Sequence, residues 1–174
     1  HPRQDPLHVA KAAEGFAQQF IGAMFEQGLH GVVALADDPA VAVPRRVFVY
    51  GVRSDPVVRD REHLEEVLAR HDVERVHLPS LDAADQVRAL RNAELVIGLP
   101  GDGLARAAFS RSAHVVELVP GTEVPGDLYY LCAAKGLPYD YVLTPGADRS
   151  ASDRRGREVH IDVDALDRLL SRPE

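Results

Sequence analysis

Short runs of β-branched and apolar residues alternate with helical patterns along most of this chain. The runs are predicted strands, and they lie at Val47–Tyr50, Arg75–Leu78, Glu94–Ile97, His114–Leu118 and Tyr139–Val142. The stretches between them repeat apolar residues at the three- and four-residue spacing of an amphipathic helix. Strands that are joined through helices are parallel, with right-handed crossovers and helices on both faces of the sheet. The sequence therefore predicts an α/β fold with a Rossmann-like parallel sheet.

The helical patterns have recognisable ends. Aspartate favours the residue before a helix, and glycine favours the residue after one. These signals predict a helix that begins after Asp60, one over about residues 82–92, one that begins near Gly103, one that ends at Gly136, and a closing helix over residues 164–170 after a short strand at 159–163.

Residues 1–44 differ from the rest of the chain. Between residues 5 and 29, apolar side chains recur at helical spacing, which predicts one long amphipathic helix with the stripe Val9, Ala13, Phe16, Phe20 and Met24. A linker with turn signals follows, so we divide the chain into a helix and linker, residues 1–44, and a Rossmann-like domain, residues 45–174. The apolar stripe needs a cover, either a second copy of the chain or a missing N-terminal domain. The chain begins with His1 rather than Met, which indicates a piece of a longer protein.

Composition argues against several classes of partner. The net charge of −7 disfavours nucleic acid, and no apolar run approaches the ~20 residues that span a bilayer. Cys132 is the only cysteine, so no intrachain disulfide is possible, which fits a cytoplasmic location. The histidines show no metal-ligand spacing, so we predict neither a metal nor a cofactor. The 18 arginines against 2 lysines are typical of a GC-rich bacterial genome.

The most informative segment passes from a predicted buried strand through a glycine-rich turn into a helix. Its glycines are Gly98, Gly101 and Gly103. Glycines let a ligand approach the backbone, and free N–H groups at the start of a helix attract anions. The spacing matches neither the dinucleotide fingerprint nor a P-loop. A purely steric role for these glycines in a tight turn stays open.

Six segments occur in a distinctive order between residues 45 and 170. They are Arg45–Val49, Arg59–Glu62, Pro79–Val87, Ala93–Phe109, Val115–Pro120 and Tyr129–Tyr139. In this order they resemble the C-terminal domain of family 61 glycosyltransferases, which have the two-domain GT-B fold. The resemblance implies the nucleotide-sugar donor-binding half of an enzyme that transfers a sugar to a hydroxyl acceptor. The acceptor half and the catalytic base would belong to an N-terminal domain, so no catalytic residue is assigned.

The resemblance also implies a set of donor-binding residues. Glu117 is expected at the carboxyl end of its strand, in contact with a ribose or sugar hydroxyl. Tyr129 and Tyr130 would stack on a base or line the cleft, and one of these two adjacent tyrosines is expected to face the core. The full set is Gly98, Pro100, Gly101, Asp102, Gly103, Leu104, Arg106, Glu117, Tyr130 and Arg53.

The glycine turn departs from the family pattern, which typically reads Gly-Pro-His-Gly-Ala-Gly-Leu-Thr-Asn. Here Pro100 replaces the histidine, Asp102 the alanine and Arg106 the asparagine. Proline cannot donate to a diphosphate, and a carboxylate about 4 Å from an anion would repel it by up to ~4 kcal/mol at a surface-like dielectric.

Two arrangements of this turn are open, and they imply different functions. If Asp102 turns away and Arg106 reaches the cleft, the turn binds a diphosphate. If Asp102 caps its own helix and pairs with Arg106, the domain is a non-catalytic, degenerate GT-B-like module for interaction or scaffolding. A polysaccharide-modifying transferase of another GT-B type shares the logic of the first arrangement.

Overall fold

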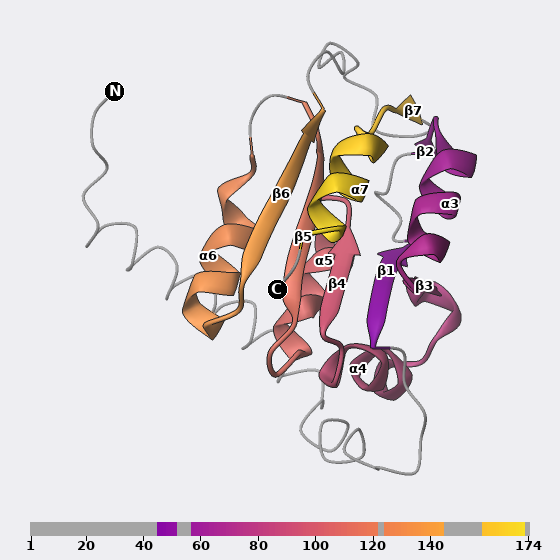
Figure 1. Ribbon diagram of the computed structural model, residues 1–174. Coiled ribbons are helices and arrows are strands. Elements are labelled where there is room, and N and C mark those ends of the chain that lie inside the picture. Colours follow the sequence, from indigo (N-terminus) through magenta and orange to yellow (C-terminus); the bar gives the residue numbers. More distant parts are fainter. Residues whose placement is uncertain (1–44, 52–56, 122–123, 145–157, 173–174) are drawn as a thin grey trace, which may run out of the picture.

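The computed structural model describes residues 45–51, 57–121, 124–144 and 158–172. In this part of the chain, five parallel strands form one sheet in the order β3-β1-β4-β5-β6 (Figure 1). Two further short strands, β2 and β7, form a separate parallel pair. The predicted parallel sheet is confirmed. The strands are β1 (Arg46–Tyr50), β2 (Val57–Val58), β3 (Glu74–His77), β4 (Leu95–Gly98), β5 (His114–Pro120), β6 (Tyr139–Thr144) and β7 (Glu158–Val159).

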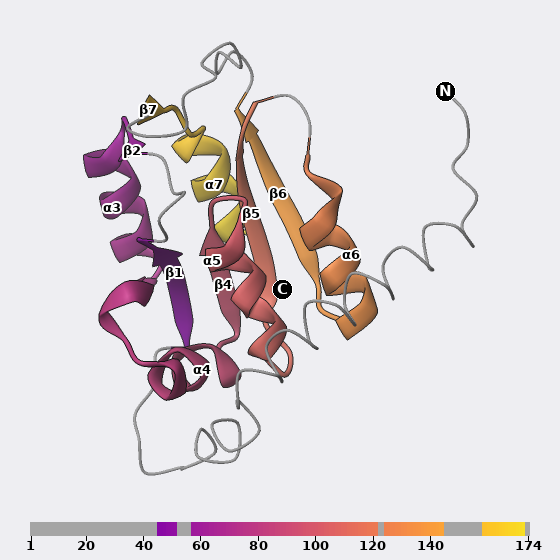
Figure 2. The same cartoon turned by 180° about the vertical axis from the view of Figure 1, so that it is seen from behind.

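Helices cover both faces of the sheet, as predicted. One face carries α3 (Arg61–Arg70) and α7 (Val163–Leu170), and Figure 2 shows the other helices from behind. These are α4 (Ala83–Arg91), α5 (Asp102–Ala105) and α6 (Gly126–Lys135), with two short 3-10 helices, η1 (Leu78–Ser80) and η2 (Arg106–Phe109).

The central strands are apolar along their length because both of their faces are covered. Val96 and Val115 belong to the core beneath α4, α5 and α6, whereas Ile97 and Val116 belong to the core beneath α3 and α7. Successive residues of a strand point to opposite faces, so each strand supplies both cores. The continuous apolar runs seen in the sequence are explained by this double burial.

The ends of the five sheet strands differ from the predicted ones by at most two residues, whereas β7 ends four residues before the end of the short strand predicted over residues 159–163. Leu78 leaves the predicted strand and begins η1, whose next residue is Pro79, and proline has no N–H for a ladder. At the other end of the sheet, β5 and β6 continue together until Pro120 pairs with Thr144. The amphipathic helix predicted over residues 5–29 and the candidate Arg53 both lie outside the described residues.

None of the helices in the described ranges is both long enough and apolar enough to cross a bilayer.

Two helices begin at an aspartate that caps them with its side chain. The Asp82 carboxylate accepts from the Asp85 N–H at 2.8 Å, and Asp162 accepts from Ala165 at the same distance at the start of α7. Asp60 precedes α3 as predicted, but its carboxylate makes no cap hydrogen bond and binds His160 instead.

The Asp82 cap leads to a first prediction. Asp82→Ala removes the acceptor for one N–H of α4, and we expect the free energy of unfolding to fall by about 1 kcal/mol. Urea denaturation measures this loss. Asp82→Asn keeps an acceptor and is the matched control, so equal losses in the two variants would contradict a capping role.

Candidate functional site

The strand order reverses direction between β1 and β4. From β1, the chain adds β3 on one side of the sheet, and then adds β4, β5 and β6 on the other side. In doubly wound sheets, ligands bind at the carboxyl ends of the strands beside such a switch point. The glycine-rich turn that follows β4 lies at this point (Figure 1). The fold therefore places the candidate turn where an α/β sheet of this order favours a ligand.

Two glycines of the turn are required by its backbone and packing. A Cβ on Gly98 would lie 2.9 Å from Cγ2 of Val49 and 3.3 Å from the Val49 carbonyl oxygen, both on the neighbouring strand β1. Gly101 has a φ of 139°, in the region that favours glycine. The steric role that the sequence left open is therefore present, and it is compatible with close approach of a ligand.

The turn leaves backbone donors without a partner. The carbonyl oxygen of Gly101 accepts from the Ala105 N–H at 3.1 Å. No residue of the described ranges accepts a hydrogen bond from the N–H of Asp102, Gly103 or Leu104. The Leu104 side chain is buried in the core, so this residue can offer only its backbone. Because α5 has four residues, its dipole adds little, and the N–H groups themselves are what an anion could bind.

Neither predicted arrangement of Asp102 and Arg106 is found complete. Gly101 occupies the cap position, and the exposed Asp102 carboxylate makes no hydrogen bond within the described part of the chain. The guanidinium of Arg106 donates to the backbone oxygen of Asp102 at 2.7 Å. The predicted capping by Asp102 and its pairing with Arg106 through the carboxylate are therefore wrong. No described residue accepts from these N–H groups, as diphosphate binding requires, while Arg106, the first residue of η2, is bound to the backbone of α5.

Glu117 lies beside the turn, although not in the expected position. The pairing of β4 with β5 places Glu117 opposite Gly98. Since β5 continues to Pro120, Glu117 lies in the middle of the strand, and only 1% of it is exposed. The expectation that Glu117 ends its strand at the surface is wrong, because the pairing of β5 with β6 lengthens both strands.

The Glu117 carboxylate is held by a residue that sequence reasoning did not assign to the site. The Tyr139 hydroxyl donates to Oε2 of Glu117 at 2.5 Å. Val115 pairs with Tyr139 in the β5–β6 register, so Glu117, two residues along β5, shares a face with the tyrosine. This register is a long-range property of the sheet, and the sequence carries no local signal of it.

Burial shifts the ionisation of three groups around Glu117. Burial raises the pKa of Glu117 above its ordinary value of 4.5, while the Tyr139 hydrogen bond opposes the shift and the charge of Asp127 adds to it. Burial and the bond to Glu117 raise the pKa of Tyr139. Burial, followed by the charge of Glu117, raises the pKa of Cys132 to about 12. At neutral pH Cys132 is therefore a thiol and a poor nucleophile.

The tyrosine pair of α6 lies at the outer flank of the domain. Tyr129 is 52% exposed and Tyr130 is partly exposed, whereas Leu128, Leu131 and Cys132 are buried. The expectation that one tyrosine of the pair faces the core is wrong. The Tyr130 ring lies over Gly126 at the beginning of α6, towards the carboxyl edge.

Ring contacts connect these tyrosines to Glu117. The ring centroids of Tyr129 and Tyr130 are 5.5 Å apart, and those of Tyr129 and Tyr139 are 5.8 Å apart, both in edge-to-face geometry. Tyr139 in turn binds Glu117, which is paired with Gly98. Of the predicted site residues, those of the turn and Glu117 are thus adjacent, and Tyr130 is joined to them through Tyr129 and Tyr139.

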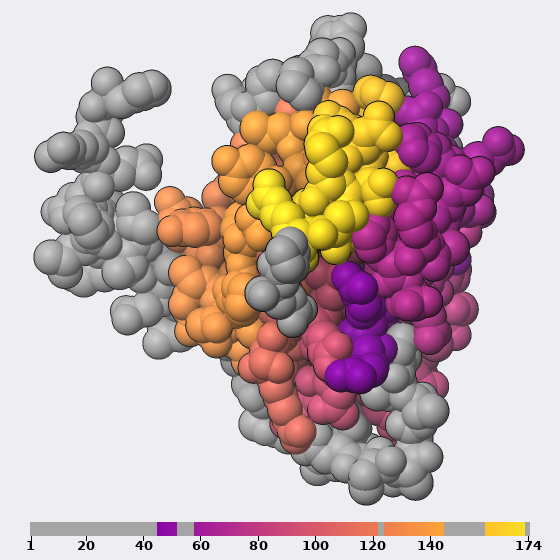
Figure 3. Space-filling view, in the orientation of Figure 1, coloured from indigo at the N-terminus to yellow at the C-terminus, as the bar shows by residue number. Residues whose placement is uncertain are grey.

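A cavity of about 520 Å³ lies at the opposite edge of the sheet, where the strands begin. Figure 3 shows atoms of β1 (indigo) at the surface below α7 (yellow), and both elements supply residues to the cavity lining. It is lined by Arg46, Glu94, Leu95, His114, Asp140, Leu169, Leu170 and Arg172, none of which was a predicted site residue.

The described ranges contain no group of three or more His, Cys, Asp or Glu side chains that could hold a metal ion.

The sequence matches no protein-family model, and no curated protein matches it.

Proposed function

We propose that this chain is the nucleotide-sugar donor-binding part of a glycosyltransferase that transfers a sugar to a hydroxyl acceptor. One observation carries the proposal: a glycine turn at the switch point of a doubly wound parallel sheet has three backbone N–H groups for which no described residue is an acceptor. A diphosphate is the ligand that such donors suit, because each N–H binds a phosphate oxygen. The resemblance to family 61 glycosyltransferases supplies the rest of the assignment.

In this proposal the turn stabilises the leaving group of the reaction. Negative charge develops on the nucleoside diphosphate as the sugar departs, and hydrogen-bond donors that are already in place stabilise that charge. Arg106 is partly exposed and can exchange the Asp102 oxygen for a phosphate, which its planar guanidinium binds well. Glu117 does not reach the ligand; its bond to Tyr139 holds β5 and β6 in register beside Gly98. The acceptor and the base belong to a part of the enzyme outside residues 45–172, so we expect no turnover by this domain alone.

The alternative is a non-catalytic module for interaction or scaffolding. Two observations favour it. Arg106 is engaged by the backbone of α5, and Tyr129 and Tyr141, whose rings both adjoin Tyr139, expose 52% and 49% of their surface. Exposed tyrosines are common at protein interfaces. Binding of a nucleoside diphosphate separates the two functions.

Calorimetry with UDP, GDP and CMP tests the proposal on the parent chain and on Asp102→Ala. We expect both diphosphates to bind, CMP to bind more weakly because it carries one phosphate, and Asp102→Ala to bind the diphosphates several-fold more tightly. The reason is that the substitution removes a carboxylate next to the N–H donors. Because Asp102 does not cap α5, its removal is expected to change the free energy of unfolding by less than about 0.5 kcal/mol.

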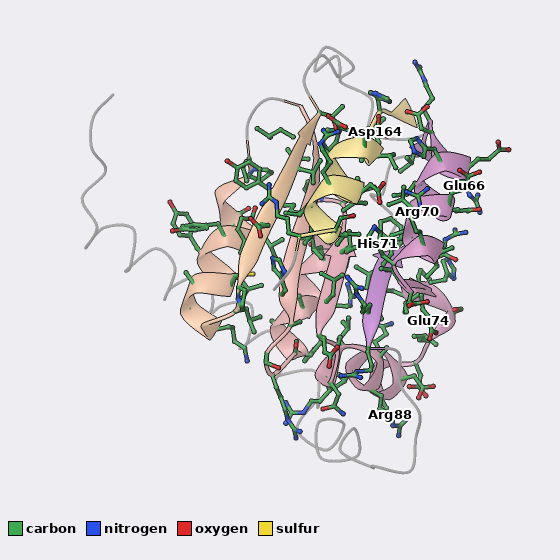
Figure 4. The ribbon with its side chains drawn as sticks, viewed as in Figure 1. Glu66, Arg70, His71, Glu74, Arg88 and Asp164 are labelled. Atoms are coloured by element: carbon green, nitrogen blue, oxygen red, sulfur yellow. The ribbon has the colours of Figure 1, made fainter. Side chains whose placement is uncertain are left out.

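Glu66→Ala is the matched control. Glu66 is an exposed carboxylate on α3 that points away from α7 and the sheet (Figure 4), so its removal changes the net charge equally without touching the turn. We expect its diphosphate affinity to equal that of the parent. Absence of binding by both the parent and Asp102→Ala would contradict the donor-site proposal and favour the interaction module.

A further inference from the structure

Three histidine–aspartate pairs lie along one seam of the fold, where α3 packs against the segment of β7 and α7. The two sides are far apart in the sequence, and the paired residues are separated by about 100 positions. We call this contact the α3–α7 seam and define it by the pairs His160 with Asp60, His63 with Asp164, and His71 with Asp167.

The pairs are spaced from one end of the seam to the other. The His160 ring binds the Asp60 carboxylate just before α3 begins. Within the first turn of α3, Nε2 of His63 lies 3.5 Å from Oδ1 of Asp164. These two pairs therefore connect the beginning of α3 with the beginning of the α7 segment.

The far end of the seam adds a permanent charge. Nε2 of His71 lies 2.7 Å from Oδ1 of Asp167, and Arg70 donates to the other oxygen of the same carboxylate at 2.6 Å. Figure 4 shows Arg70 and His71 at the end of α3 that faces α7, and Asp164 near the beginning of α7. The hydrogen bond from His71, together with the charges of Arg70, His71 and His63, lowers the pKa of Asp167 below its ordinary value. This carboxylate therefore stays charged throughout the neutral range.

Several other charged groups around the seam are engaged elsewhere or point away from it. On α3, Arg61 pairs with Glu65, Glu65 also binds Arg75 of β3, and Glu66 points outward. At the start of α7, Asp162 accepts from the Ala165 N–H. The cavity that lies near the end of α7 is also lined by two titratable side chains of the sheet. These are His114 and Asp140, which lie 2.9 Å apart. Further charged residues of these segments include Arg59, Glu62, Asp72, Arg168 and Arg172.

We propose that the α3–α7 seam is a pH-responsive clasp, which holds α7 more tightly when His63, His71 and His160 are protonated. Histidine is the side chain that ordinarily changes charge between about pH 5 and pH 8, whereas aspartate stays ionised over that range. A protonated imidazole attracts its aspartate through charge and a hydrogen bond, and a neutral one keeps at most the hydrogen bond. The contribution of these pairs to the stability of the seam is therefore largest below the pH range in which histidine ordinarily titrates. It decreases as the pH rises through that range.

Arg70 limits the size of the change. Its bond to Asp167 does not depend on pH in this range, so the far end of α7 stays partly held when the histidines are neutral. An exposed ion pair changes an equilibrium by about 1.4- to 5-fold, so three pairs together are expected to raise the opening constant of α7 about tenfold between about pH 6 and pH 8.

Hydrogen–deuterium exchange of the full chain, read by mass spectrometry of peptides, measures this opening directly. Exchange of the α7 amides at about pH 6 and pH 8 is corrected for the intrinsic rate at each pH, with the α4 amides as the internal reference. We expect the opening of α7 to rise about tenfold relative to α4 in the parent. In the triple variant His63→Gln, His71→Gln, His160→Gln, α7 should open at both pH values as it does in the parent at about pH 8.

His114→Gln is the control, because it removes an equivalent pair with Asp140 near the end of α7 without touching the α3–α7 seam. We expect it to keep the parent's pH dependence. If the triple variant does not fold, His63→Gln alone, at a half-exposed position, should lose part of that dependence. A parent whose α7 opens equally at both pH values overturns the proposal, and so does a folded variant that keeps the full dependence.

Discussion

Tyr139→Phe is expected to lower the free energy of unfolding by about 1.5–3 kcal/mol at neutral pH, since it removes a hydrogen bond to a buried acidic group. The Tyr139 hydroxyl donates to Glu117 at 2.5 Å, and the glutamate has only 1% of its surface exposed. Without the hydroxyl, no described side chain is hydrogen-bonded to this carboxylate. Chemical denaturation of the parent and the variant measures the loss.

The ionisation of Glu117 determines whether the penalty of Tyr139→Phe increases or decreases with pH. Burial raises the pKa of Glu117 above 4.5, so between 4.5 and the raised value the folded state binds more protons than the unfolded state. The contribution of this group to stability is therefore largest in acid and falls as the pH rises through that window. Tyr139→Phe removes an interaction that favours the charged form, so we expect its penalty to be larger at about pH 8 than at about pH 5.

Glu117→Gln is the companion variant. It keeps the shape and removes the charge, so its stability relative to the parent should increase as the pH rises through the same window. A cycle with both substitutions isolates the pair, and we expect the two single effects to be non-additive by about 0.5–3 kcal/mol. Additive effects, or a Tyr139→Phe penalty that is equal at both pH values, would show that the contact with Glu117 contributes nothing to folding.

Gly98→Ala is expected to destabilise the domain by about 1–3 kcal/mol, because a methyl group is forced into a packed core. Its Cβ would lie 2.9 Å from the Val49 side chain and 3.3 Å from the Val49 carbonyl oxygen and from Cδ1 of Leu104. The backbone of β1 cannot rotate away as a side chain can, so either β4 or α5 must shift. Thermal unfolding reports the loss, and calorimetry with UDP reports whether the turn has moved.

Gly126→Ala is the matched control for this substitution. The added Cβ would meet only the Tyr130 ring, whose nearest atom lies 3.0 Å away and can swing aside. Alanine also restricts the unfolded chain, so this variant should be unchanged or more stable by up to about 1 kcal/mol. A larger loss from Gly126→Ala than from Gly98→Ala would mean that the packing of β4 against β1 is not what demands a glycine.

Local patterns were sufficient to predict the class of fold. The runs at Val47–Tyr50 and Val115–Leu118 lie in strands because β-branched residues covered on both faces suit little else. Asp82 and Gly136 mark helix ends because the cap signals act within a few residues. The strand order was not predictable in this way, since it depends on which strands meet in space, and the switch point could be located only in the folded sheet.

The candidate site, like the fold, was predictable only where the signal is local in the sequence. The sequence located the turn from Gly98 to Gly103, but not the neighbours that decide its chemistry. Capping of α5 by Asp102 was one of the two arrangements left open, whereas Gly101 occupies that position. The partner of Glu117 lies 22 residues further along the chain, in another strand. The seam pairs are still more distant in sequence, so neither spacing nor composition could reveal them.

The position of α7 in the chain has a consequence for biosynthesis. Phe48, Ile97, Val116 and Leu118 form one core with Leu166 of α7, which follows all five strands. β6 ends at Thr144, and α7 begins 19 residues later at Val163. A ribosome adds about 5–20 residues per second, so it needs roughly 1–4 s to synthesise this stretch. During that interval α3 already covers part of this face of the sheet, but the apolar surface that α7 later covers is bare, and chaperones can bind it. A stop codon in this stretch would release a chain that keeps the glycine turn but presents an uncovered core, which quality-control proteases would remove.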